Sequence, residues 1–199
     1  MDVKEYMFKR YGLVEGKPPY FIPIMREELG SIFKDLGFKV GAEIGVERGI
    51  FSKSILEQNP GMKLYCVDAW KVYKGYRDHV NQDKITRYYE ETKKRLKPFD
   101  VEIIRDWSME AVKKIPDESL DFVYIDGNHD FQHVTNDIVE WSKKVRKGGI
   151  IAGHDYVKRR SSVECQVKGV VDAMTYMYRI NPWFVLTGNL FSSWLWIKR

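Results

Sequence analysis

Acidic residues stand at the ends of five short apolar segments along the chain. They are Glu43, Asp68, Asp106, Asp126 and Asp155. In an open sheet of parallel strands, ligands bind beyond the carboxyl ends of the strands, close to the point where the strand order reverses. One or two acids at such ends are common in any chain, whereas five of them indicate a binding site along one edge of a sheet.

The first of these ends is a glycine turn that runs from Glu43 to Gly49 with the spacing E-x-G-x-x-x-G. A turn that binds a dinucleotide pyrophosphate has a further glycine where Glu47 stands, and a carboxylate there would repel phosphate. Glu43 can instead face an ammonium or sulfonium group, and Gly45 lets the backbone come close to that group. The alternative interpretation is a plain corner between a strand and a helix.

The next two ends carry side chains that suit a nucleoside. Asp68, followed by Ala69, comes about twenty residues after the glycines, where an acid binds ribose hydroxyls. Asp106, Trp107 and Ser108 together can accept a hydrogen bond from an adenine amine and stack a ring against the base. Alternatively, Ser108 caps the helix that follows and Trp107 packs in the core.

Two of the four histidines of the chain lie close to the last two acids. If the strands that end at Asp126 and Asp155 are neighbours, their ends are about 4.8 Å apart and His129 and His154 join them in one pocket. A histidine can remove a proton from a substrate near neutral pH, which makes His129 and His154 candidate catalytic residues. For His133 we prefer a structural, hydrogen-bonded role.

The elements that must position these residues alternate between strand and helix, which predicts a parallel sheet covered on both faces. Strands are predicted over residues 39–44, 63–67, 101–104, 122–125, 150–153, 183–186 and 193–197. Helices are predicted over residues 23–36, 50–58, 108–115, 131–145 and 163–177, and a helical stripe lies within 70–98. Because the last two strands can pair across a short turn, we predict a Rossmann-like α/β fold with a doubly wound, mostly parallel seven-stranded sheet and a C-terminal antiparallel hairpin.

Composition limits the class of protein. A chain of 199 residues with 44% hydrophobic composition can bury one core. We therefore predict a single domain over residues 1–199, with a helical segment at 1–37 before the Rossmann-like core at 38–199. The spacing of Cys66 and Cys165 suits neither a metal nor a disulfide framework, so we expect core thiols.

Charge and hydropathy suggest which partners to expect. No stretch reaches the roughly 18 apolar residues that span a bilayer, and the first residues lack the apolar run of a secretory signal. We expect a cytoplasmic protein without a membrane partner. The net charge of +5 is spread along the chain, which allows a nucleic-acid partner without favouring one. A homo-oligomer is equally compatible with the sequence.

Four motifs resemble those of class I S-adenosylmethionine-dependent methyltransferases, in the branch of small O-methyltransferases that includes the macrocin-type sugar and natural-product enzymes. The motifs are GAEIGVERGIFSKSIL, YCVDAW, FVYIDGNHDF and GGIIAGHDY, and the resemblance covers roughly residues 38–157. It implies S-adenosylmethionine as the cofactor, bound by a set of residues from four strand ends: Glu43, Gly45, Gly49, Asp68, Ala69, Asp106, Trp107, Ser108 and Asp126.

The same resemblance implies a metal site and an acceptor site. In metal-dependent relatives, acids after the fourth and fifth strands bind Mg²⁺, and the matching residues here are Asp126, His154 and Asp155, although His154 stands where many relatives have a second acid. The expected acceptor is a small molecule, contacted by the 1–37 segment, the 70–98 segment and the loop at 156–165. One interpretation is that the tyrosines at 73, 76, 88 and 89 form a lid over it, and the other is that Tyr88 and Tyr89 only pack their helix. The alternatives are a methyltransferase of RNA or another macromolecule, and a non-catalytic module that binds an adenosyl ligand.

Overall fold

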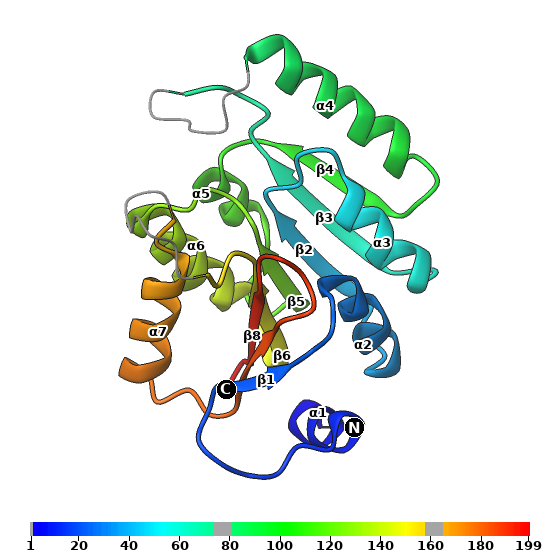
Figure 1. The fold of residues 1–199 in the computed structure, drawn as a ribbon. Coiled ribbons are helices and arrows are strands. Elements are labelled where there is room, and N and C mark those ends of the chain that lie inside the picture. Colours follow the sequence, from blue (N-terminus) through cyan, green and yellow to red (C-terminus); the bar gives the residue numbers. More distant parts are fainter. Residues whose placement is uncertain (1, 74–80, 158–164) are drawn as a thin grey trace.

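One eight-stranded sheet forms the centre of the computed structural model, which describes residues 2–73, 81–157 and 165–199 (Figure 1). Its strands are β1 (Tyr20–Ile22), β2 (Val40–Ile44), β3 (Lys63–Asp68), β4 (Val101–Arg105), β5 (Leu120–Ile125), β6 (Val145–Gly153), β7 (Trp183–Leu186) and β8 (Ser193–Ile197). The helices are α1 (Val3–Tyr11), η1 (Arg26–Glu28), α2 (Leu29–Asp35), α3 (Ile50–Gln58), α4 (Gln82–Leu96), α5 (Ser108–Ala111), η2 (Val112–Lys114), α6 (Phe131–Lys144) and α7 (Val167–Met177).

The strand order is β1-β7-β8-β6-β5-β2-β3-β4. Strand β8 runs antiparallel to both β6 and β7, and every other neighbouring pair in the sheet is parallel. The chain adds strands to one side of β2 as far as β4 and then crosses to β5 on the other side, so the strand order reverses between β2 and β5. Ligands of such sheets bind above this reversal point.

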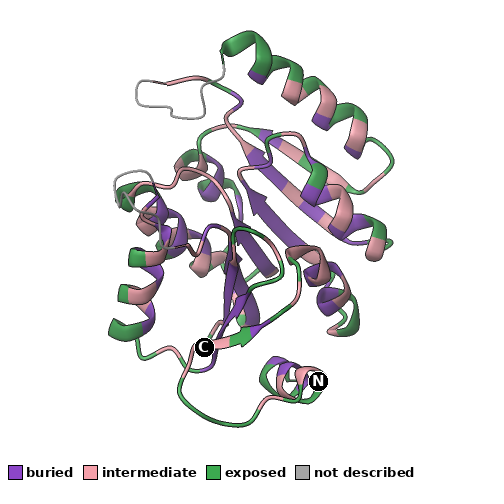
Figure 2. Ribbon diagram, viewed as in Figure 1, coloured by how far each residue is buried: buried purple, intermediate pink, exposed green. Residues whose placement is uncertain are grey.

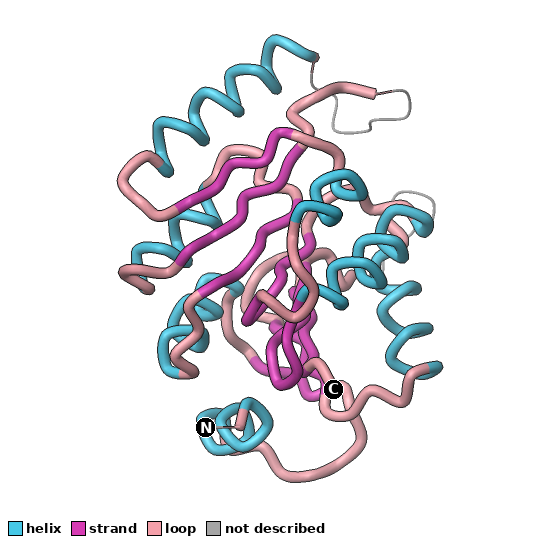
Figure 3. The backbone as a smooth tube through the Cα atoms, turned by 180° about the vertical axis from the view of Figure 1, so that it is seen from behind, coloured by secondary structure: helices cyan, strands magenta, loops and turns pink. Residues whose placement is uncertain are grey.

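Helices cover both faces of the sheet, because successive residues of a strand point to opposite sides. On β5, Phe122 and Tyr124 pack with α1, α2, α3 and α4, whereas Val123 and Ile125 pack with α5, α6 and α7. The view from behind in Figure 3 shows the same two helical layers. Figure 2 shows that the central strands are buried almost throughout and that each helix turns a buried stripe towards them.

The predicted fold class is confirmed, and α3, β7 and β8 have the predicted bounds. Other elements differ from their predicted bounds. The helix predicted over 23–36 is η1 followed by α2, and the helix predicted over 108–115 is α5 followed by η2. Strand β6 begins at Val145 rather than at 150, and Gly148 and Gly149 lie inside it instead of ending a helix. A side chain at Gly149 would meet the carbonyl oxygen of Asp121 at 2.4 Å, so this glycine permits the close pairing of β5 and β6 where their register shifts.

Strand β1 is the eighth strand, which the sequence did not predict. It has three residues, and the middle one, Phe21, is 60% exposed, so no apolar pattern marks it. Its hydrogen-bonding partner, β7, comes more than 160 residues later in the chain. Helix α1 lies in the 1–37 segment predicted to be helical, although its bounds were not predicted: Asp2 caps its start by accepting a hydrogen bond from the backbone N–H of Glu5, and Gly12 ends it with a positive φ.

Two smaller predictions can be compared with the structure. Cys66 and Cys165 are both buried and neither forms a disulfide within the described residues, as expected of core thiols. Val163, predicted to begin the last helix, lies outside the described residues. None of the helices in the described part of the chain combines the length and the apolar character needed to cross a membrane.

Candidate functional site

The glycine turn after β2 lies directly against the end of β5. Gly45 has a φ of 88°, and a Cβ atom there would be 2.1 Å from the backbone oxygen of Asp126, so only glycine fits this contact between the two strands. Gly49 also has a positive φ and precedes α3. Glu47, at the position of the missing glycine, adopts a φ of 51°, and its carbonyl oxygen accepts a hydrogen bond from the indole of Trp70 at 2.7 Å.

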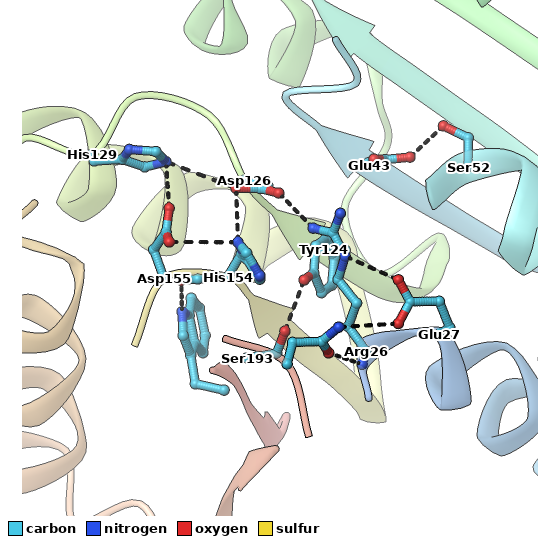
Figure 4. A network of polar contacts seen from close by, with 12 residues as sticks. Arg26, Glu27, Glu43, Ser52, Tyr124, Asp126, His129, His154, Asp155 and Ser193 are labelled. Atoms are coloured by element: carbon cyan, nitrogen blue, oxygen red, sulfur yellow. Dashed lines mark hydrogen bonds and ion pairs between the residues drawn. The ribbon is translucent and has the colours of Figure 1, made fainter. Parts of the chain in front are cut away.

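Glu43 lies beneath this turn rather than on its surface. The residue is 2% exposed, and its carboxylate accepts a hydrogen bond from the hydroxyl of Ser52 in α3 (Figure 4). Burial raises the pKa of Glu43 to about 8, although the Ser52 hydrogen bond opposes the increase. Glu43 is therefore mostly neutral at pH 7, and in this arrangement it supports the turn from below instead of facing a cation.

Asp68, at the end of β3, joins two loops. One carboxylate oxygen accepts a hydrogen bond from the backbone N–H of Glu47 at 2.9 Å, and the other accepts one from the N–H of Trp70 at 2.7 Å. Burial raises the pKa of Asp68, and these backbone hydrogen bonds partly offset that effect. Each oxygen retains a further lone pair for a ligand hydroxyl.

A pocket of about 530 Å³ opens beyond the ends of β3 and β4. It is lined by Ala69, Lys71, Gln82, Thr86, Arg105, Asp106 and Trp107. Trp107 is 42% exposed, so it is a wall of this pocket and not a core residue. Asp106 accepts a hydrogen bond from the ammonium of Lys114 at 2.8 Å, and this contact lowers the pKa of Asp106. Three of the residues predicted to bind the cofactor thus meet in one pocket.

Ser108 is not part of that pocket wall. Its hydroxyl donates a hydrogen bond to Asp137 of α6 and accepts one from the indole of Trp141 at 2.8 Å. It also does not cap the helix, because Trp107 occupies the N-cap position without a side-chain hydrogen bond. The hydroxyl of Ser108 therefore ties α5 to α6 behind the pocket.

The acids and histidines after β5 and β6 converge in space, as Figure 4 shows. The two strands are neighbours in the sheet. Nε2 of His129 lies 3.0 Å from Oδ2 of Asp155, and Nδ1 of His154 lies 3.6 Å from Oδ1 of Asp126 and 3.6 Å from Oδ1 of Asp155. One donor atom each from Asp126, His154 and Asp155 lie within 4.8 Å of one another, which is the arrangement of a candidate metal site.

Two histidines and an arginine lie around Asp126 and lower its pKa. Burial alone would raise its pKa, but His129, His154 and Arg26 together hold the pKa below its usual value. Arg26 donates a hydrogen bond from Nη1 to Oδ2 of Asp126 at 3.0 Å. The sequence had assigned only the whole 1–37 segment to the site. No local motif distinguishes Arg26, and its position depends on how that segment folds against the sheet.

The tyrosines expected near the acceptor divide into two groups. The hydroxyl of Tyr73 accepts a hydrogen bond from Asn128, and its ring packs edge-on against Trp107 with 5.4 Å between the centroids. Tyr88 and Tyr89 pack against the core from their helix, as one of the two interpretations had it. Tyr76 lies outside the described residues. His133 pairs with Asp130, the N-cap of α6, in the structural role expected of it.

Comparisons with known proteins agree with this geometry. The sequence matches the family model described as a methyltransferase domain over residues 42–156. No curated protein matches the chain significantly.

Solved structures with similar folds share little sequence with the chain. Cofactor-bound Rv0187 from MTB has a TM-score of 0.66 at 12% identity, covering 89% of this chain and 82% of that one. The O-methyltransferase from Bacillus cereus solved with SAH has a TM-score of 0.63 at 14% identity, covering 99% and 90%. The O-methyltransferase TomG from Streptomyces achromogenes solved with SAM has a TM-score of 0.63 at 13% identity, covering 87% and 79%. These similarities establish the fold. The family model matches more than half of the chain, so the chain belongs to the methyltransferase-domain family.

Proposed function

We propose that the protein transfers a methyl group from S-adenosylmethionine to a hydroxyl oxygen of a small molecule. One observation carries the proposal: the reversal of the strand order between β2 and β5 is flanked by a pocket suited to adenosine and by a cluster of acids and histidines. Family membership supports methyl transfer. The similar folds of O-methyltransferases solved with SAH or SAM support the cofactor and the acceptor atom.

The cofactor side of the site is built from the turn after β2 and the ends of β3 and β4. Trp107 presents an exposed face on which adenine can stack. Asp106 can accept a hydrogen bond from the adenine amine, and Asp68 can accept hydrogen bonds from the ribose hydroxyls. When bound, S-adenosylmethionine supplies a methyl carbon made electrophilic by its sulfonium. The residues that would hold it are Gly45, Gly49, Asp68, Ala69, Asp106, Trp107 and Asp126, with Glu43 and Ser108 supporting them from behind.

Asp126, His154 and Asp155 would hold a divalent cation. The donor set fits one, because its three donor atoms lie within 4.8 Å of one another and the neighbours of Asp126 hold its pKa below the usual value. Carboxylates suit Mg²⁺ or Mn²⁺, and the imidazole also admits softer transition metals. Such an ion lowers the pKa of an acceptor hydroxyl.

We assign removal of the acceptor proton to His129. Both rings face Asp126 and Asp155, but the side chain of His129 is 32% exposed, whereas that of His154 is 14% exposed. The carboxylate of Asp155, 3.0 Å from Nε2 of His129, would stabilise the imidazolium that forms when the ring takes up a proton. His154 then serves as a metal ligand and His129 as the base.

Calorimetric titration of the purified protein with S-adenosylmethionine and S-adenosylhomocysteine tests the cofactor. We expect saturable binding of both compounds, followed by methyl transfer to members of a panel of small hydroxylated compounds when Mg²⁺ or Mn²⁺ is added. Failure of both adenosyl compounds to bind would remove the proposal. Tight, steeply salt-dependent RNA binding combined with transfer to RNA would redirect it to a macromolecular acceptor.

A further inference from the structure

Arg26 is the residue through which the N-terminal segment meets the cluster of acids and histidines. Nη1 of Arg26 lies 3.0 Å from Oδ2 of Asp126 (Figure 4). The guanidinium also lies over the ring of Phe51, with 4.9 Å between its central carbon and the ring centroid. The side chains of Arg26 and Asp126 are 24% and 22% exposed, so the pair is largely shielded from water. Arg26 lies outside the residues that match the methyltransferase family model.

The two carboxylate oxygens of Asp126 face different partners. Oδ2 accepts the hydrogen bond from Arg26, whereas Oδ1 lies 3.6 Å from Nδ1 of His154 and 3.8 Å from Nε2 of His129. A carboxylate is planar, so a donor that holds one oxygen also sets the direction of the other. We propose that Arg26 is a positioning residue that holds Oδ2 of Asp126 so that Oδ1 faces the two histidines.

Arg26 is itself held by the loop between β7 and β8. Its backbone N–H donates to Oδ1 of Asn189 at 2.6 Å, and the side-chain amide of Asn189 donates to Glu27 at 3.4 Å. In the same loop, Gly188 donates its N–H to the carbonyl oxygen of Ile24 at 2.8 Å. These hydrogen bonds fix the backbone at Arg26, so its guanidinium has a defined position beside Asp126. Residues that hydrogen-bond to metal ligands are commonly held in place in this way.

The expected effect of Arg26 on metal binding rests on the proposed function, since a misdirected Asp126 would be a poorer metal ligand. Partners of metal ligands typically contribute about 10–100-fold in metal affinity. We therefore expect Arg26→Met to lower the affinity for Mn²⁺ by about that factor and to lower the affinity for S-adenosylhomocysteine much less, because Asp126 is one of several residues that would hold that compound. Arg26→Lys should restore part of the loss, because an ammonium can hold Oδ2 but lacks the guanidinium fork.

The experiment compares Arg26→Met, Arg26→Lys and Asp126→Asn with the control Arg10→Met. Arg10 belongs to the same N-terminal segment and pairs with Asp35 at 2.6 Å, away from the site, so its removal reports on general loosening of that segment. Two measurements are made on each variant: Mn²⁺ binding by calorimetry, and the ring nitrogen resonances of the histidines by NMR at one fixed pH.

If Arg26 orients Asp126, then Arg26→Met moves the ring nitrogens of His129 and His154 in the same direction as Asp126→Asn does. His133, which pairs with Asp130, and all histidines of Arg10→Met should stay at their wild-type positions. Unchanged His129 and His154 resonances in Arg26→Met would overturn the inference. If the wild-type protein binds S-adenosylhomocysteine but not Mn²⁺, the metal proposal fails while the histidine resonances still decide the role of Arg26.

Discussion

The ends of β2 and β5 lie side by side in the sheet, yet the pKa values of their acids, Glu43 and Asp126, are shifted in opposite directions. Burial raises the pKa of Glu43 to about 8, because its only hydrogen-bond donor among the described contacts is the neutral hydroxyl of Ser52. Burial acts on Asp126 as well, but two histidines and Arg26 hold its pKa below the usual value. The partners, rather than the depth of burial, determine which acid carries a charge. A charged acid can bind a cation, whereas a neutral one supports the backbone.

The largest effect is expected from Asp126→Asn. The substitution removes the charge that attracts a cation and two histidines, so we expect the rate of methyl transfer to fall by about 10²–10⁴. The affinity for Mn²⁺, measured by calorimetry, should fall with it. Methyl transfer at the wild-type rate by Asp126→Asn would mean that the two strand ends do not differ in the way the pKa directions indicate.

Asp68→Ala is expected to weaken the binding of S-adenosylmethionine by about 10–100-fold, since charge-assisted hydrogen bonds contribute about 1.5–3 kcal/mol. The backbone N–H groups of Glu47 and Trp70 also lose their acceptor, so a lower thermal midpoint is expected too. Asp121→Ala is a suitable control, because Asp121 likewise accepts backbone N–H groups, those of Lys39 and Val40, but away from the pocket. Equal losses of cofactor affinity in both variants would contradict a direct role for Asp68.

Trp107→Ala should weaken cofactor binding by about tenfold, because stacking of a base on an aromatic ring contributes about 1–3 kcal/mol. Trp107 is 42% exposed, so little destabilisation should accompany the loss. Trp107→Phe, which retains a ring, serves as the matched variant and should bind more tightly than Trp107→Ala. Calorimetry with S-adenosylhomocysteine measures all three proteins, and identical affinities would remove the adenine assignment of the pocket.

The smallest effect is expected from Glu43→Gln, which should change the free energy of unfolding little at neutral pH because the amide resembles the neutral acid. The folded state keeps the proton on Glu43 up to a pKa of about 8, against an ordinary value of 4.5. The resulting stabilisation is complete at acidic pH and is lost as the pH rises through about 8. Urea unfolding should therefore show that the free energy of unfolding of the wild type falls between about pH 6 and about pH 9 by about 3 kcal/mol more than that of Glu43→Gln. Parallel declines would mean that Glu43 is already ionised at pH 6.

Much of the sheet could be predicted from the sequence because its central strands carry continuous apolar runs that end in turn residues. The proximity of Asp126 and Asp155 could also be predicted, because neighbouring parallel strands bring their carboxyl ends to one edge of the sheet. Strand β1 escaped prediction because its stability comes from pairing with β7 and not from its own three residues.

The direction of a side chain was harder to predict than its place along the chain. Glu43 and Ser108 lie at the expected ends of their elements, but their polar atoms bond to Ser52 and Asp137 rather than face the crevice. Arg26 was missed for a related reason, because nothing nearby in sequence indicates the carboxylate that it meets a hundred residues later.

The position of β8 between β6 and β7 has a consequence for the order in which the molecule is assembled during synthesis. Strand β1 leaves the ribosome before β7, its neighbour in the described part of the sheet, and β7 is joined to the other strands through β8. The indole of Trp194 in β8 also donates a hydrogen bond to the carbonyl oxygen of His154. Nascent chains that stop before residue 193 should therefore hold the β1–β7 pair without its link to β6 and should lack the hydrogen bond from Trp194 to His154, and both should form only when β8 inserts.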